Sequence, residues 1–259
     1  MTKKYYFVTT LLPSLQIGSI PELGSRELSH ILEENLSSKD LKEVEAIRRV
    51  VDMENLRLFW QKRAFNPGGT YTENDFEECF FWRERLPEYV LAYVEKYPSD
   101  ENKIAHFSEL FETFFRIEQE EKHTSFVKEY IRFEWEWRQA LVFLRARTLE
   151  YDMRQKIGET EDPFLEELLR HKDDTVFEMP EGFTPLKTLY EQRKHSPLDL
   201  HQGIEEWRFN HIADTIRWKT FSLSRILGYV AQLAIVETWL ELDRKKGLHI
   251  IDRMMTVSK

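Results

Sequence analysis

The sequence predicts an all-α, multi-helix protein with at most a minor strand at the N-terminus. Glycine and proline occur only nine times each in 259 residues, which leaves few residues for the tight turns that strands require. Charged residues make up 32% of the chain and aromatic residues 14%, a mixture typical of helices with one solvent-exposed and one buried face. The aromatic content also excludes a disordered chain, because so much apolar surface must be buried.

The first stretch with a clear local preference is Tyr5–Leu12, which is rich in aromatic and β-branched residues and ends before Pro13. So short an apolar run is typical either of one strand or of the first turns of a buried helix. Ser37 or Ser38 then stands where a side chain would cap a long helix with an apolar stripe. The helices expected in this part of the chain cover residues 28–36 and 38–58.

Turn residues divide the rest of the chain. Residues 66–69 (Asn-Pro-Gly-Gly) form the clearest break, and Thr72–Asp75 has the spacing of a capping box at the start of a helix. Gly247 stands where a left-handed residue would end the last helix, and residues 171–185 are expected to be irregular. The later helices are expected at residues 87–97, 101–154 with an interruption near 123–125, 164–170, 185–193, 197–218 and 223–246.

Charge and cysteine usage narrow the class of protein. A net charge of −9 argues against nucleic acid as the main partner, because phosphate binding requires a basic face. The single cysteine, Cys79, excludes an internal disulfide and favours a reducing compartment. The N-terminus lacks the features of a signal peptide, and the most apolar window, Ile226–Leu240, is shorter than a membrane span. We therefore expect a cytoplasmic protein that is at most peripheral to a membrane.

The motifs of common enzyme classes are missing from the sequence. There is no Walker A loop, no G-x-G-x-x-G and no G-x-S-x-G, so direct nucleotide binding and serine hydrolase chemistry are not expected. Cys79 follows Glu78, a carboxylate that would raise the pKa of the thiol, so a buried inert cysteine is predicted. Glu120–His123 has the Glu-x-x-His spacing of a di-metal bundle, and His211–Asp214 is a weaker pair. Among 46 acidic residues and 8 histidines, such spacings arise by chance.

A loose internal repeat occurs three times, each time as an acidic residue, an apolar helix face and a basic end. The three copies lie at residues 51–63, 134–147 and 229–247. This order suits a helix dipole and is also what ordinary surface helices show.

These three segments resemble the C subunit of prokaryotic V/A-type ATPases, which is called subunit d or AC39 in eukaryotes. That family carries D-x-x-N-L helices followed by a basic stretch, and a closing helix that runs from Tyr-Val to a glutamate. The second copy has Trp137 where the asparagine is expected. The opening YYFVTTLLPSL is similar to that of a divergent bacterial branch found beside V-type ATPase subunits and labelled as a domain of unknown function. The matching positions are Asp52, Asn55 and Leu56 in the first copy, Arg145 and Arg147 in the second, and Tyr229 and Glu237 in the third.

The resemblance implies a non-catalytic coupling subunit: a funnel of three helical subdomains that links the central rotor stalk to the ion-carrying membrane ring. It implies stalk and ring subunits as partners, on the cytoplasmic face of the inner membrane, with no catalytic residue, cofactor or metal. We expect one domain over residues 1–259, with subdomain breaks near 66–70 and 171–185, in which the matched positions pack helices. The alternatives are a helical-bundle metalloenzyme with carboxylate and histidine ligands, and a free-standing helical adaptor.

Overall fold

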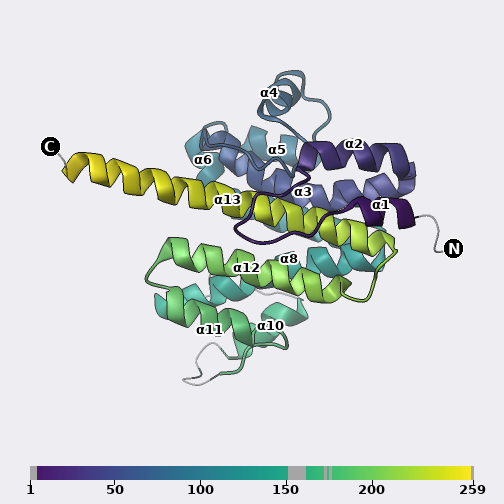
Figure 1. The fold of residues 1–259 in the computed structure, drawn as a ribbon. Coiled ribbons are helices and arrows are strands. Elements are labelled where there is room, and N and C mark those ends of the chain that lie inside the picture. Colours follow the sequence, from purple (N-terminus) through teal and green to yellow (C-terminus); the bar gives the residue numbers. More distant parts are fainter. Residues whose placement is uncertain (1–4, 151–161, 172–173, 175–176, 258–259) are drawn as a thin grey trace. The chain divides into compact units, whose positions relative to one another are not determined.

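The computed structural model describes residues 5–150, 162–171, 174 and 177–257, with side chains described no further than Glu241. Within these residues the chain forms twelve α-helices and no strand, which confirms the all-α fold (Figure 1). The chain divides into two compact units. Unit 1 comprises residues 1–131 and 209–259, and unit 2 comprises residues 132–208. Residues 66–70 lie inside unit 1 and residues 171–185 inside unit 2, so the expected subdomain breaks stay a prediction.

Unit 1 is built on two long helices, α3 (Ser38–Trp60) and α13 (Leu223–Val257), which lie side by side (Figure 1). Both present apolar side chains at helical spacing to a common core, among them Ile47 and Val50 on α3 and Val230 and Leu233 on α13. The remaining helices of this unit are α1 (Tyr6–Leu11), α2 (Ser25–Asn35), α4 (Glu73–Trp82), α5 (Glu88–Lys96), α6 (Asp100–Ala105) and α7 (Phe107–Glu120), with the start of α8 (Ser125–Thr148) and the end of α12 (Pro197–Ile216).

Two capping boxes begin helices at the predicted places. The Ser37 hydroxyl accepts from the Asp40 amide at 3.3 Å, and the Asp40 carboxylate accepts from the Ser37 amide at 3.4 Å. Thr72 and Asp75 make the same pair of bonds at the start of α4. Each box satisfies two amides that a helix start leaves without partners, which explains why both boundaries were visible in the sequence.

The sequence left strand and helix open for Tyr5–Leu12, and Tyr6–Leu11 is helix α1, in which the Thr9 and Thr10 hydroxyls donate to backbone carbonyls four and three residues earlier and Val8 is buried. One predicted boundary is wrong. Gly247 does not end the last helix, since α13 runs through it to Val257. A glycine inside a helix costs only about 1 kcal/mol, so it does not by itself end one.

The long helix predicted over residues 101–154 is divided in three. The expected interruption near residues 123–125 is confirmed, because α7 ends at Glu120 and α8 begins at Ser125. A further break at His106 separates α6 from α7. α8 ends at Thr148, and the predicted continuation beyond residue 150 lies outside the described residues.

Unit 2 has a core of its own. Its helices are most of α8, then α10 (Pro163–Arg170), α11 (Thr184–Arg193) and most of α12. One apolar cluster joins all four through side chains such as Phe143 on α8, Leu168 on α10, Leu186 on α11 and Ile204 on α12. Among the described residues 177–183 no helix is assigned, in agreement with the irregular connection predicted there.

Candidate functional site

Asn55 binds the loop that follows α3. It lies on the buried side of α3 with no exposed surface, and its carboxamide forms two hydrogen bonds with Asn66. The backbone N–H of Asn66 donates to Asn55 Oδ1 at 2.9 Å, and Asn55 Nδ2 donates to the backbone carbonyl of Asn66 at 2.9 Å. The carboxamide therefore pairs with the loop backbone as a neighbouring peptide group would, and it satisfies two groups that have no helical partner.

Asp52 binds the same loop one helical turn earlier. Its Oδ1 accepts from the Thr70 amide at 2.7 Å and from the Tyr71 amide at 3.2 Å. The side chain is only 2% exposed, and Oδ2 has no hydrogen-bond partner among the described residues. Burial raises the pKa of Asp52 to about 6, although the two amides and the positive charge of Arg48 act in the opposite direction.

The glycines of the loop allow this close approach. A Cβ atom on Gly69 would lie 2.5 Å from Asp52 Oδ1 and 2.7 Å from Asn55 Nδ2. A Cβ atom on Gly68 would lie 2.8 Å from the Cβ of Ala234 on α13. The break predicted at residues 66–69 is therefore a packed junction between α3 and α13, where only glycine leaves enough room.

Polar contacts continue from the loop to α13 and α2. Asn66 Nδ2 donates to the Ala234 carbonyl at 2.9 Å. Three residues further along α13, Glu237 accepts from the Ser25 amide at 3.0 Å and from its hydroxyl at 2.6 Å, so it caps the start of α2. Burial raises the pKa of Glu237 against these two bonds. Asp52, Asn55 and Glu237 thus lie in one polar network that joins α2, α3 and α13.

Arg48 is a member of this network that the sequence motifs did not mark. It donates to the Ser29 hydroxyl at 2.7 Å, while its Nε is buried without a hydrogen-bond partner among the described residues. Burial lowers the pKa of Arg48, and the nearby charges of Asp52 and Glu237 partly offset this. The only sequence signal for Arg48 is that it precedes Asp52 by four residues, a spacing that places both side chains on the same face of α3.

The other matched positions in unit 1 are structural. Leu56 has no exposed surface and belongs to the core. Tyr229 is 3% exposed, and its hydroxyl has no hydrogen-bond partner among the described residues. Burial raises the pKa of Tyr229 to about 12. These two residues supply packing and make none of the loop contacts described above.

The two matched arginines belong to unit 2. Arg147 donates to the carbonyls of His171 and Asp174, and its guanidinium lies 4.3 Å from the centre of the Phe177 ring. It therefore fixes the chain that follows α10. Arg145, two residues earlier on α8, is exposed.

A second polar network, in the core of unit 2, was missed by the motif search. Glu134 has no exposed surface and accepts from Arg208 at 2.6 Å, from Arg138 at 2.6 Å and from the Trp137 indole at 2.9 Å. Burial alone would raise the pKa of Glu134, but the positive charges of Arg208 and Arg138 lower it to about 2. Glu134 precedes Trp137 by three residues, as Asp52 precedes Asn55, so the loose repeat did contain a signal.

His123, considered above as a metal ligand together with Glu120, has a different carboxylate partner in the structure. His123 Nε2 lies 3.2 Å from Glu118 rather than contacting Glu120, and Glu118 also binds Arg49 through two bonds of 2.7 and 2.8 Å. Cys79 is buried in the packing of α4. No group of three or more potential metal ligands is found within the described residues.

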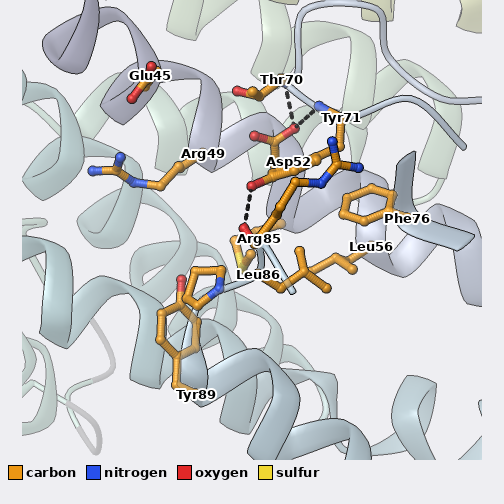
Figure 2. Close-up of a pocket in the computed structure, with 12 residues that line it drawn as sticks. Glu45, Arg49, Asp52, Leu56, Thr70, Tyr71, Phe76, Arg85, Leu86 and Tyr89 are labelled. Atoms are coloured by element: carbon orange, nitrogen blue, oxygen red, sulfur yellow. Dashed lines mark hydrogen bonds between the residues drawn. The ribbon is translucent and has the colours of Figure 1, made fainter. Parts of the chain in front are cut away.

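A pocket of about 580 Å³ opens beside Asp52. It lies between α3, the loop at Thr70 and Tyr71, and the segment that leads into α5, all within unit 1 (Figure 2). In Figure 2 one oxygen of Asp52 is bonded to the Thr70 and Tyr71 amides, and the other is on the side where Arg49 lies. The lining residues are Glu45, Arg49, Asp52, Met53, Leu56, Thr70, Tyr71, Phe76, Arg85, Leu86, Pro87 and Tyr89.

The fold and site define an all-helical protein of two compact units, in which buried carboxylates organise the long helices. The chain belongs to the family described as protein of unknown function DUF2764, whose model matches residues 1–258. An uncharacterized protein of Chlamydia muridarum is 25% identical over 256 residues, 95% of this chain and 96% of the relative. One from Chlamydia trachomatis is 25% identical over 255 residues, 94% and 95% of the two chains. No solved structure matches the chain.

The comparisons leave the likeness to rotary ATPase subunits untested, because the matched proteins carry no functional description. Within the residues that the structure describes, no helix combines the length and apolar character needed to cross a membrane.

Proposed function

We propose that this chain is a non-catalytic coupling subunit of a V-type ATPase or ATP synthase, which links the central rotor stalk to the membrane ring. The observation that carries the proposal is the role of the matched positions. Asp52, Asn55 and Glu237 hold a loop and the start of α2 to the long helices of unit 1. A part that transmits torque between partners needs such rigid junctions between helices more than it needs a reactive centre.

Exposed aromatic side chains support an interaction role. Phe81 and Trp82 at the end of α4 are 76% and 67% exposed, and their rings contact each other at 4.8 Å. Trp218, in the turn before α13, is 87% exposed. Aromatic residues are enriched in protein interfaces, where they bury a large area with few rotatable bonds. We assign these three side chains to contacts with the partner subunits.

Co-purification from native membranes tests the proposal. The tagged chain is expressed in cells of its own source, and membranes are extracted in mild detergent before affinity purification and mass spectrometry. We expect stalk and ring subunits of the V-type enzyme in the eluate. Their absence, with the bait folded and abundant, would contradict the proposal.

Surface variants make the test specific. The double variant Phe81→Ser/Trp82→Ser and the single variant Trp218→Ser remove exposed rings without touching the core. We expect at least one of them to lower recovery of the partners severalfold. Ile20→Ser is the matched control, because it removes an aliphatic side chain that is 85% exposed. Equal loss with this control would show that the aromatic side chains are not the contacts.

Metal analysis separates the coupling subunit from the metalloenzyme alternative. The protein purified without chelators is measured by inductively coupled plasma mass spectrometry. Stoichiometric iron, manganese or zinc would count against the coupling role and in favour of a carboxylate-bound metal.

A further inference from the structure

The pocket beside Asp52 has the composition of a small-molecule site. Its walls are largely apolar, with Met53, Leu56 and Phe76 among the lining side chains, and a few polar groups converge on it. Its volume of about 580 Å³ falls in the range of pockets that hold small ligands. All lining residues belong to unit 1, so the pocket is complete within one compact body.

Two polar atoms of the lining residues are buried without hydrogen-bond partners among the described residues. They are Oδ2 of Asp52, on a side chain that is 2% exposed, and the hydroxyl of Tyr89. A buried carboxylate oxygen without a donor is strongly unfavourable, and such groups in native proteins normally have a partner. Both nearby backbone amides, those of Thr70 and Tyr71, already donate to Oδ1, so they provide no donor for Oδ2.

The charges that line the pocket favour a positively charged ligand. The Arg49 guanidinium is held by two bonds to Glu118, at 2.7 and 2.8 Å. The Arg85 guanidinium lies 3.3 Å from Asp75 and 3.6 Å from Glu78. Both arginines are therefore already paired with carboxylates. The positive charge of Arg48 also acts on Asp52, but no hydrogen bond joins the two side chains, so Oδ2 lacks a hydrogen-bonding cation among the described residues.

We propose that this pocket binds a small organic amine, whose ammonium group donates a hydrogen bond to Oδ2 of Asp52. The apolar body of the amine packs against Met53, Leu56 and Phe76, which line the same pocket. An ammonium supplies several donors and a charge opposite to that of the carboxylate, which makes the bond to Asp52 shorter and stronger than a neutral one. The proposal does not depend on the coupling function.

Nuclear magnetic resonance titration of the full chain with 2-phenylethylamine tests the assignment. The backbone amides of Thr70 and Tyr71 are the reporters, because both donate to Asp52. We expect saturable shifts of these two amides in the wild-type protein. We expect the affinity to fall about tenfold or more in Asp52→Asn, because a charged hydrogen bond is lost.

A second comparison keeps the test decisive even where Asp52→Asn fails to fold. Replacing the amine by 2-phenylethanol keeps the apolar body and removes the charge, so we expect the affinity of the wild-type protein to fall about tenfold.

Three results would overturn the assignment. The first is the absence of saturable shifts in the wild-type protein, as expected where water alone satisfies Oδ2. The second is an unchanged affinity in a folded Asp52→Asn variant. The third is equal affinity for the amine and the alcohol, which would show that the pocket recognises only the apolar body.

Discussion

Replacing Asp52 by Asn is expected to stabilise the protein at neutral pH, although it removes a buried ionisable group. Burial raises the pKa of Asp52 from 3.8 to about 6 in the folded state. One pKa unit corresponds to about 1.4 kcal/mol, so ionising this buried carboxyl costs about 3 kcal/mol of folding free energy. An asparagine stays neutral, and its carbonyl oxygen accepts from the same amides of Thr70 and Tyr71.

The pH dependence follows from the direction of the shift. Below about pH 4 the carboxyl is protonated in the folded chain and largely protonated in the unfolded chain, so the penalty is absent. It grows as pH rises from 4 to 6 and is complete above the folded pKa. The charged or titratable groups around Asp52 are Glu45, Arg48 and Arg49 on α3, Tyr71 in the loop, Arg85 before α5 and Tyr89 on α5, with Glu237 of α13 near Arg48. The arginines and tyrosines keep their protonation state between pH 4 and 6, whereas burial raises the pKa of Glu237.

Urea unfolding at pH 7 and pH 4, followed by tryptophan fluorescence and circular dichroism, measures the effect. Asp52→Asn is expected to exceed the wild type by up to about 3 kcal/mol at pH 7, and the difference should shrink toward zero at pH 4. Asp75→Asn is the control of opposite sign, because hydrogen bonds from Thr72 lower the pKa of Asp75. A folded Asp52→Asn variant that is less stable by the same amount at both pH values would refute the reasoning.

Three further variants test the two networks by urea unfolding. Asn55→Ala leaves a backbone amide and a carbonyl of the loop buried without partners, so a loss of about 3 kcal/mol is expected. Gly69→Ala places a methyl group against Asp52 and Asn55 and should cost about 1–3 kcal/mol. Glu134→Gln removes one of the two carboxylates bound to Arg208, Glu205 being the other, and should cost about 3 kcal/mol at pH 7, as the lowered pKa of Glu134 implies. The pKa of Glu134 is about 2, so this loss should fade as pH drops from about 4.5 toward 2.

The variants at Gly69 and Glu134 each have a matched control. Gly203→Ala introduces a methyl group that meets only the ends of the Leu189 and Arg193 side chains, and it improves helix propensity, so a change within about 1 kcal/mol is expected. Equal losses in Gly69→Ala and Gly203→Ala would contradict the packed junction. Glu136→Gln, in a pair whose arginine, Arg132, is exposed, should change stability by less than about 1 kcal/mol. A loss at Glu134 no larger than this would contradict the buried ion network.

Local signals in the sequence were enough for the helices and several of their ends. Apolar spacing predicted α2 and α3, a helix cap was predicted at Ser37 or Ser38, and a capping box was predicted at Thr72–Asp75. These features depend on residues three or four apart, whose contacts are fixed by the geometry of a single helix. Where the local pattern was too short, as at Tyr5–Leu12, it left strand and helix open, and the helix was realised.

The partners of the buried polar groups needed the tertiary structure. Glu134 and Arg208 are 74 residues apart in the chain, and Ser25 and Glu237 are 212 residues apart. Neither pair can be found from spacing, because any of the many carboxylates of this acidic chain satisfies the same local rules. Only the folded chain shows which of them are buried and which cation or amide they meet.

For this protein, the sequence alone determined that the chain is helical, where its main loop lies and which helix starts are capped, because these depend on neighbouring residues. It also marked Asp52 and Asn55 as a pair. The tertiary structure decided what the pair does: it places residues 66–71 against α3, and it leaves one oxygen of Asp52 without a partner beside a pocket. That outcome depends on close packing between distant segments, which no local pattern encodes.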